Sequence, residues 1–157
     1  MADVNRNRTS STGFDPRLFL RDEELDNGIA LLLAGERALI NLAEPLISLP
    51  DMPPLAKRVL IAARFQPGQT VRALGHHLGT TTPTLARILG QLDKGGLIER
   101  RATRTDRRSK AVFLSTEGKR LTDEATIVLR NRLREAYRQA GANAVVGKRA
   151  VLKALLT

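Results

Sequence analysis

Apolar residues recur at the three- and four-residue spacing of an α-helix along most of this chain. A first stripe predicts a helix over about 22–44, which Pro45 ends or kinks. A second stripe predicts a helix over 55–65, which prolines open and the turn sequence Gln66-Pro67-Gly68 closes. The residues of the first stripe are Leu25, Ile29, Leu32, Leu33, Leu39, Ile40 and Ala43.

Two shorter helices are predicted directly afterwards. Thr70 can cap a helix over 71–78, which a glycine ends. Thr80 or Thr81 can cap the next helix, over 82–94, whose apolar residues follow the spacing i, i+3, i+4, i+7. Two such helices packed across one another after a tight turn form a helix-turn-helix. The predicted buried residues of the second helix are Leu85, Ile88, Leu89 and Leu92.

A basic segment follows the helix-turn-helix. The apolar-containing runs 97–101 and 111–114 are joined by a polar turn, which is typical of a β-hairpin. The turn 104–110 carries four Lys or Arg residues and one acid, Asp106, which can brace the turn through its own backbone. A basic hairpin in this position is the arrangement of a DNA-binding wing.

The last part of the chain is again helical in pattern. Ser115 can cap a long helix, Glu117 is favourable in its first turn, and Gly141 ends it before a final apolar helix. The unit 55–114 can fold by itself, so the apolar stripes on either side of it need another partner. Packing against the same helices of a second copy would cover these stripes. The alternative is that the terminal helices pack within one chain.

The predicted fold is mainly α with a small β-hairpin wing, in four segments. They are a disordered N-terminal tail (1–13), an N-terminal dimerisation helix (14–50), a winged helix-turn-helix DNA-binding region (53–114) and C-terminal dimerisation helices (115–157). The polar start lacks the apolar region of a secretory signal. No apolar run approaches the length of a transmembrane helix. A cytoplasmic protein is therefore expected.

The charge distribution favours a polyanionic partner. The net charge is +10, and residues 97–120 hold eight Lys or Arg against three Asp or Glu, whereas 22–51 is net acidic. Four Phe, one Tyr and no Trp offer few stacking platforms for single strands or RNA, so duplex DNA is the better candidate. The absence of Cys excludes disulfides, thiolate metal sites and a cysteine nucleophile.

Several motifs, in this order and spacing, resemble the MarR family of bacterial winged-helix transcription regulators. They are Leu92-Asp93-Lys94-Gly95-Gly96-Leu97-Ile98-Glu99-Arg100, Asp106-Arg107-Arg108 and Val112-Phe113-Leu114-Ser115-Thr116-Glu117-Gly118, after the helix-turn-helix. The resemblance implies a homodimer joined by its terminal helices on a near-palindromic operator, most often a repressor released by a small aromatic or anionic effector. The sequence departs from the family in Gly75, where Ala is usual, and in lacking an Asp shortly before Asp106.

The outer face of the predicted recognition helix carries the candidate base contacts. Arg87 could bridge O6 and N7 of a guanine, and Thr82 or Thr84 could touch a thymine methyl or a phosphate. The alternative is a solvated face with one arginine. The residues of this helix predicted to face DNA are Thr81, Thr82, Pro83, Thr84, Arg87 and Gln91.

The predicted wing supplies the remaining DNA contacts. Arg107 or Arg108 is expected to enter the minor groove, where a narrow A·T-rich groove attracts arginine. Arg104 and Lys110 are expected to contact phosphates. By the resemblance, Asp106 positions an arginine through a salt bridge.

An effector pocket, where one exists, is expected between the winged lobe and the dimer helices, with Arg37, Arg58 and Arg64 as candidates to meet an anion. His76 and His77 point about 100° apart on a helix, so they are a poor metal-chelating pair, and neither metal nor cofactor is predicted. The signatures of phosphate-binding loops, nucleophilic serines and zinc proteases are also missing, so the chain is predicted not to be an enzyme.

Three functional hypotheses remain open from the residues themselves. The leading one is a dimeric regulator that reads a specific duplex DNA sequence. The second is an architectural or nonspecific nucleic-acid binder that uses the same charge without base readout. The third is a winged-helix module that docks its basic wing on an acidic protein partner.

Overall fold

The structure is a computed structural model that describes residues 20–102 and 110–156 of the 157-residue chain. The predicted N-terminal tail and the predicted wing tip lie outside these described residues. The chain divides into two compact units, residues 1–37 and 38–157. The division falls inside the first helix, α1 (Asp22–Ala43).

The first unit contains the greater part of α1. The predicted helix over 22–44 is confirmed, with its end one residue earlier. Asp22, Glu23 and Glu24 occupy the first turn, where the partial positive charge of the helix start favours carboxylates. Only Ala43, at the far end of α1 and already in the second unit, is buried.

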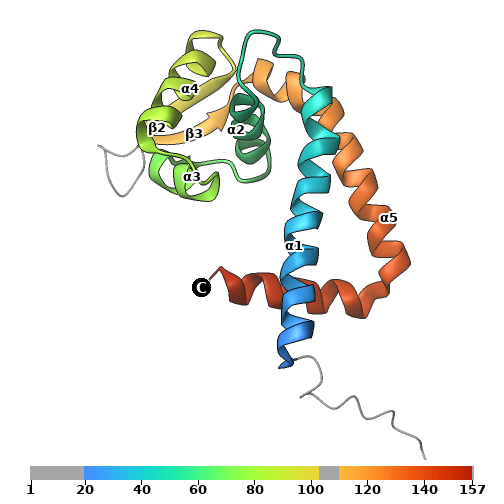
Figure 1. Cartoon of the computed structure of the whole chain (residues 1–157). Coiled ribbons are helices and arrows are strands. Elements are labelled where there is room, and N and C mark those ends of the chain that lie inside the picture. Colours follow the sequence, from blue (N-terminus) through green and yellow to red (C-terminus); the bar gives the residue numbers. More distant parts are fainter. Residues whose placement is uncertain (1–19, 103–109, 157) are drawn as a thin grey trace, which may run out of the picture. The chain divides into compact units, whose positions relative to one another are not determined.

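The second unit is mainly helical with a small antiparallel sheet, as the sequence predicts. In Figure 1 the helices α2, α3 and α4 gather around the strands β2 and β3. Its elements in chain order are the 3-10 turn η2 (Glu44–Leu46), α2 (Pro54–Phe65), β1 (Gln69–Thr70), α3 (Val71–His77), α4 (Thr82–Lys94), β2 (Ile98–Ala102), β3 (Lys110–Leu114) and α5 (Thr116–Leu155).

Three helices of this unit begin at predicted capping residues. The side chains of Thr70, Thr81 and Ser115 each accept a hydrogen bond from the backbone N–H three residues ahead, at 3.1, 3.4 and 3.0 Å. Of the two candidate caps for α4, Thr81 is therefore the one used. Gly79 ends the turn after α3 at φ +59°, a left-handed conformation that suits glycine.

The sheet contains one strand that the sequence pattern does not reveal. β3 lies in the middle, pairs with β2 as the predicted hairpin, and pairs on its other edge with β1. The short strand β1 joins through the register Gln69 to Val112 and Thr70 to Ala111. A two-residue strand carries too few side chains for an alternating pattern, so sequence periodicity does not predict it.

The core of the second unit lies between the helices and one face of the sheet. It joins buried side chains from the end of α1 through to α5, and α4 contributes four large, fully buried side chains to it. Val112 and Leu114 of β3 point into it, whereas Phe113 between them is only half-buried. This alternation is the period-two pattern of a strand with one covered face.

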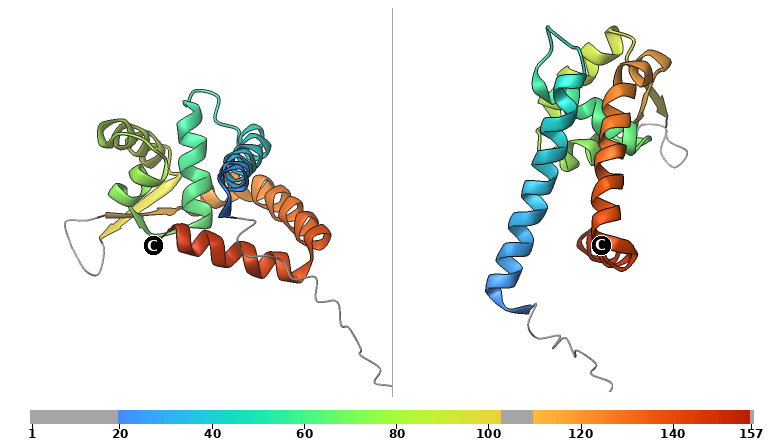
Figure 2. Two further views of the ribbon diagram at one scale, coloured as in Figure 1. Left: turned by 60° about the horizontal axis from the view of Figure 1, so that its bottom comes forward. Right: turned by 90° about the vertical axis from the view of Figure 1, so that its right-hand side faces the viewer.

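The helix α5 consists of two segments joined at Gly141. Gly141 has φ +80° and ψ 167°, which is not helical, and the chain changes direction there (Figures 1 and 2). The predicted end of a long helix at Gly141, followed by a last helix, is confirmed. No helix in the described ranges has both the length and the apolarity needed to cross a membrane.

Candidate nucleic-acid interface

The helices α3 and α4 meet at a tight turn over residues 78–81. The N–H of Thr80 donates to the carbonyl oxygen of Gly75 at 3.0 Å, which fixes the turn. A Cβ placed on Gly75 would lie 3.4 Å from Leu85 Cδ2 and 3.6 Å from the carbonyl oxygen of Thr80. These are ordinary contact distances, so Gly75 is not required there by sterics and the usual alanine would fit.

One face of α4 anchors it and the opposite face is open. Leu85, Ile88, Leu89 and Leu92 are all 0% exposed, as the apolar spacing predicts. Thr82 and Pro83 are exposed at the start of the helix, and Arg87 is exposed in its second turn. An arginine and small residues at the start of such a helix can approach base edges closely.

Two other predicted contacts of α4 are already engaged or covered. The Thr81 hydroxyl donates to the Thr84 hydroxyl at 2.9 Å, and Thr84 is half-buried. Gln91 is also half-buried, and its Oε1 is a buried atom without a hydrogen-bond partner among the described residues. Arg87 is thus the exposed cation of this helix face, with Thr82 and Pro83 beside it.

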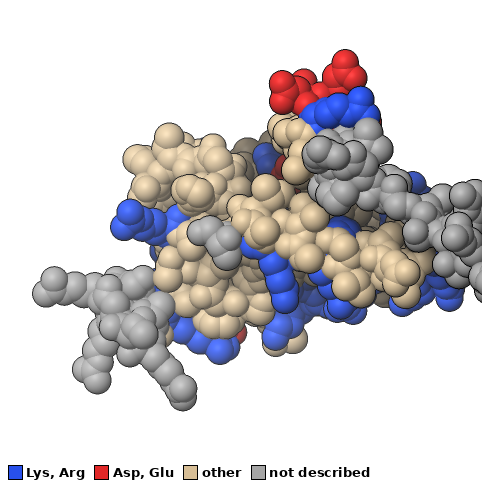
Figure 3. All heavy atoms as spheres, turned by 90° about the horizontal axis from the view of Figure 1, so that it is seen from below, with Lys and Arg blue, Asp and Glu red and all other residues tan. Residues whose placement is uncertain are grey.

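The wing is described only at its base. Lys110 is exposed at the start of β3, where it pairs with Ala102 of β2. The other predicted wing contacts, Arg104, Asp106, Arg107 and Arg108, lie outside the described residues. Lys and Arg side chains stand at several places along the edges of the face drawn in Figure 3.

An ion pair that sequence reasoning missed joins the end of α4 to the wing. Arg100 of β2 donates to Asp93 Oδ2 from Nε at 3.1 Å and from NH2 at 2.5 Å. The ion pair links the last turn of α4 to β2 across the intervening turn. The sequence signal was two opposite charges on either side of the Gly95-Gly96 turn.

A second missed residue is Arg72, in the first turn of α3. Its side chain is exposed, and the first helix of a helix-turn-helix normally crosses the DNA backbone. His76 and His77 lie on the same helix, where His77 is exposed. Within the described ranges, no group of three or more His, Cys, Asp or Glu side chains is placed to hold a metal ion.

The start of α5 is locked onto the turn that follows α4. Ser115 N donates to the Leu97 carbonyl at 3.1 Å, and the Ser115 hydroxyl donates to the Gly96 carbonyl at 2.6 Å. A Cβ on Gly118 would collide with the same Leu97 carbonyl oxygen. The turn at Gly96 and Leu97 and the first turn of α5 at Ser115 and Gly118 therefore pack directly against each other.

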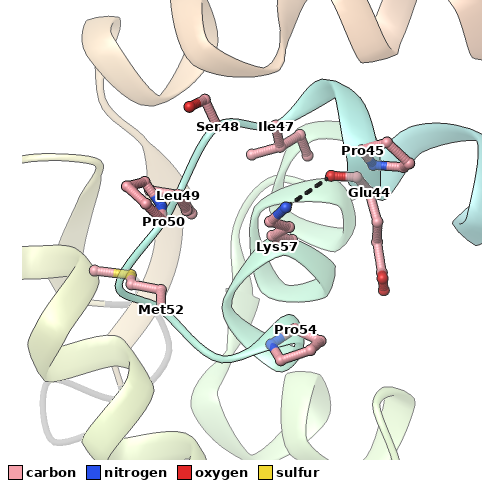
Figure 4. A pocket seen from close by; sticks show the side chains of 9 residues that line it. All are labelled: Glu44, Pro45, Ile47, Ser48, Leu49, Pro50, Met52, Pro54 and Lys57. Carbon is pink, nitrogen blue, oxygen red and sulfur yellow. Dashed lines mark hydrogen bonds between the residues drawn. The ribbon is translucent and has the colours of Figure 1, made fainter.

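Two of the pockets that the described residues form lie in the second unit. The first is about 410 Å³ and is formed by η2, the segment 47–53 that follows it and the start of α2 (Figure 4). Ile47, Leu49 and Met52 give it apolar walls. Its lining cation, Lys57, donates to the Glu44 carbonyl at 3.0 Å, so this ammonium group is already partnered.

The second pocket is also about 410 Å³ and lies between the end of α2, the strands β2 and β3, and α5. Arg64 lines it, whereas Arg58 lines neither of the two pockets. Arg37 belongs to the first unit. The three arginines predicted for an anionic effector are thus not gathered in one described pocket.

Sequence comparison gives the family. The sequence model of the MarR family matches residues 51–109, which run from just before α2 to the wing. The HTH-type transcriptional regulator PetP of Rhodobacter capsulatus is 34% identical over 148 residues, covering 94% of this chain and 89% of PetP. The chain belongs to the MarR family. It is accordingly a helix-turn-helix transcription regulator and not an enzyme.

Solved structures of MarR-family proteins share the fold. NadR in complex with 4-hydroxyphenylacetate is 21% identical, with a TM-score of 0.64, covering 79% of this chain and 88% of NadR. A mutant of S. aureus MepR, bound to an oligodeoxyribonucleotide, is 22% identical, with a TM-score of 0.50, covering 81% of this chain and 94% of MepR. At these identities the likeness concerns the fold alone.

Proposed function

We propose that this MarR-family regulator reads a specific duplex DNA sequence as a homodimer, with α4 of each copy in the major groove of one half-site. The observation that carries the proposal is the two-sided α4, which is fully buried on one face and presents Arg87 on the other. Arg87 supplies base readout through guanine O6 and N7. Lys110 and the predicted wing arginines supply phosphate and minor-groove contacts.

The names of similar proteins support this proposal. PetP is called an HTH-type transcriptional regulator, and the MepR mutant was solved with an oligodeoxyribonucleotide. The charge also agrees, because a net charge of +10 attracts a polyanion. The place of Arg87 on the open face of α4 favours base readout over an architectural role.

Dimerisation is proposed from the apolar surface of the terminal helices. Large apolar side chains are exposed on α1 and on α5, which is unusual for a soluble monomer when they form continuous stripes. A second copy about a two-fold axis would cover them. The exposed apolar residues are Leu25, Ile29, Leu31, Leu32, Leu33, Leu39 and Leu42 of α1, and Ile127, Leu133, Val146, Val151 and Leu155 of α5.

The charges of the same helices support pairing of α1 with α5 of the partner. α1 carries five Asp or Glu against one Arg, whereas residues 127–157 carry seven Lys or Arg against one Glu. Opposite charges around an apolar stripe favour the unlike pair and disfavour pairing of α5 with α5. A symmetric dimer contains two such unlike contacts.

We further propose a repressor on a near-palindromic operator that a small aromatic or anionic effector releases. The effector-bound NadR structure supports a ligand-responsive member of this fold. In this proposal Arg37, Arg58 and Arg64 stay candidates for the anion. A regulator of this kind couples ligand and DNA through the difference in its affinity for the two states.

The experiment that tests the function is selection of bound genomic fragments by the purified protein at about 150 mM salt, where nonspecific charge attraction is reduced. A two-fold-symmetric motif with half-sites about one helical turn apart is expected. Uniform recovery without a motif would replace the specific regulator by the architectural binder. No recovery would favour an acidic protein partner.

A further inference from the structure

The end of the recognition helix α4 is joined to the start of α5 through one serine. The Ser115 N–H donates to the Leu97 carbonyl at 3.1 Å, and the Ser115 hydroxyl donates to the Gly96 carbonyl at 2.6 Å. Both acceptors belong to the turn that follows α4. This contact between residues 95–97 and residues 115–118 is called the α4–α5 junction below.

The Ser115 hydroxyl makes two hydrogen bonds with different consequences. Its oxygen accepts from the Gly118 N–H at 3.0 Å, which caps the start of α5. Its proton is donated to Gly96, on the other side of the junction. Capping needs only an acceptor, so the donated bond goes beyond what the start of a helix requires. A Cβ on Gly118 would collide with the Leu97 carbonyl oxygen, so the two backbones also meet directly.

The turn on one side of the junction continues the hydrogen bonding of α4. The Leu97 N–H donates to the Leu92 carbonyl at 2.9 Å. The Gly96 N–H donates to the Asp93 carbonyl at 3.0 Å. Gly96 has φ +67°, the left-handed conformation in which helices often end. A group that binds this turn is therefore connected to the recognition helix itself.

On its other side the junction leads into a long helical arm. α5 is helical from Thr116 to its break at Gly141, and residues 116–140 span about 37 Å at about 1.5 Å per residue. The arm has buried residues as far as Leu129, whereas residues 130–136 are all exposed. The last segment of α5, with its exposed apolar side chains, follows this arm (Figures 1 and 2).

The length of the arm makes the angle at the junction important. A tilt of about 5° would displace the far end of the arm by about 3 Å, which is close to the rise of one base pair, about 3.4 Å. In a dimer that is joined through the terminal helices, such a tilt changes the distance between the two copies of α4. A stiff junction is therefore needed if the dimer is to accept a single spacing of half-sites.

We propose that Ser115 is a positioning residue for DNA binding. Its hydrogen bond to Gly96 fixes the angle between α4 and the arm, and this angle sets the half-site spacing that the dimer accepts. α5 otherwise packs mainly against α2, η2 and β3, so the junction is its hydrogen-bonded connection to the end of α4. The inference rests on the proposed dimeric function, because a single half-site has no spacing.

Substitutions of Ser115 separate its bond to Gly96 from its capping of α5. Ser115→Thr keeps a hydroxyl that both accepts and donates. Ser115→Asp keeps an acceptor that caps a helix about as well as serine does, but the carboxylate has no proton to donate. Ser115→Ala loses both bonds. Thr70→Ala removes the cap of α3, away from the junction, and is the control for the loss of a cap.

The first measurement is the distance between spin labels on α4 and α5 in the DNA-free protein. The chain has no Cys, so Ala86→Cys and Arg138→Cys create two exposed labelling positions. Pulsed electron paramagnetic resonance gives the distribution of this distance, and an excess of unlabelled chain restricts the signal to label pairs within one copy.

The width of this distribution reports the stiffness of the junction. Wild type, Ser115→Thr and Thr70→Ala are expected to give equally narrow distributions. Ser115→Asp and Ser115→Ala are expected to give distributions wider by about 3 Å or more. An unchanged width in both would overturn the proposal without reference to DNA. Circular dichroism checks that each variant folds, and Ser115→Ala replaces Ser115→Asp in the comparison if the carboxylate prevents folding.

The second measurement is the affinity for duplexes that differ in half-site spacing by one base pair at a time. The half-sites come from the genomic selection, and a duplex with one half-site is the reference. Wild type, Ser115→Thr and Thr70→Ala are expected to prefer one spacing by about tenfold or more. Ser115→Asp should lose this preference while its affinity for one half-site stays within about twofold of the wild type.

The outcomes separate this inference from the proposed function. If the wild type prefers one spacing and Ser115→Asp keeps that preference, the role of Ser115 is wrong and the dimeric regulator stands. An equal loss of affinity for one and for two half-sites would also overturn the role, because α4 itself would then be damaged. If the wild type selects no two-fold-symmetric site, the proposed function is wrong and the spacing role is overturned with it.

Discussion

The helix α4 and the second segment of α5 carry apolar stripes of similar appearance in the sequence, but the structure treats them in opposite ways. The four large apolar residues of α4 are fully buried inside the second unit, whereas Val146 is 67% and Leu155 65% exposed. The difference teaches that helical periodicity predicts which face of a helix is apolar, but not which chain covers that face. Where an apolar stripe is not covered by its own chain, a partner that covers it contributes stability.

The largest effect is expected from a cavity in the buried region. Leu89→Ala should destabilise the fold by about 2–5 kcal/mol, because the lost side chain leaves a space in a close-packed core. Arg87→Ala, on the exposed face of the same helix, should cost far less. Urea unfolding followed by circular dichroism measures both. Similar losses for the two variants would mean that the apolar face of α4 does not form the core.

Charged residues placed on the exposed apolar stripe of α5 should dissociate the dimer without unfolding the protomer. Val151→Asp with Leu155→Asp should shift a dimer toward monomer, since two carboxylates would enter an apolar contact. Sedimentation analysis measures the dissociation constant, which should rise about a hundredfold or more. Arg72→Asp with Lys94→Asp, at exposed positions outside the terminal helices, is the control for charge alone. A variant that stays fully dimeric would show that another surface joins the copies.

Two cations should have different roles in DNA recognition. Arg87→Ala should cost about 1–3 kcal/mol at the preferred base and relax the preference there. Lys110→Ala should weaken binding to all sequences alike and reduce the salt dependence by about one counterion. Fluorescence anisotropy with matched and mismatched duplexes at several salt concentrations measures both changes. If Arg87→Ala weakened all duplexes equally, base readout by α4 would be excluded.

The smallest expected effect lies at the kink of α5. The Lys148 ammonium donates a hydrogen bond to the Tyr137 hydroxyl at 3.0 Å across Gly141, which favours phenolate and lowers the pKa of Tyr137 below its usual value. Because Tyr137 is the single tyrosine and Trp is absent, ultraviolet absorbance titration reports it directly.

Lys148→Met should raise the pKa of Tyr137 back toward its usual value. A pKa lowered by folding contributes its full stability above the pKa of the unfolded chain, and this contribution declines as the pH falls and is gone below the folded pKa. Stability near neutral pH should therefore not change in Lys148→Met. An unchanged titration curve in this variant would mean that the two sides of the kink do not meet in solution.

Sequence signals predict this fold well where the chemistry is local. Thr70, Thr81 and Ser115 cap the helices expected of them, because a side chain that accepts from a backbone N–H three residues ahead needs only its neighbours. The central hairpin and the break at Gly141 follow from the same kind of short-range preference. The strand β1 is not predicted by such local signals, because its two residues form a strand only through their pairing with β3.

The candidate site was less predictable than the fold. Arg87 was placed on an open face by the helical period, but the covered oxygen of Gln91 and the Thr81–Thr84 hydrogen bond depend on neighbours that a helical wheel does not include. The pairing of Arg100 with Asp93 and the convergence of Lys119 and Arg130 on β2 and β3 require parts of the chain that lie on different elements.

The sequence by itself determined the helical stripes, the caps, the basic wing segment and the family of this protein. These properties depend on residue type and spacing within one or two turns of the chain. The tertiary structure decided which stripe became a core, which strand joined the sheet, and which cations surround a pocket. Those outcomes require side chains from distant segments of the chain to meet.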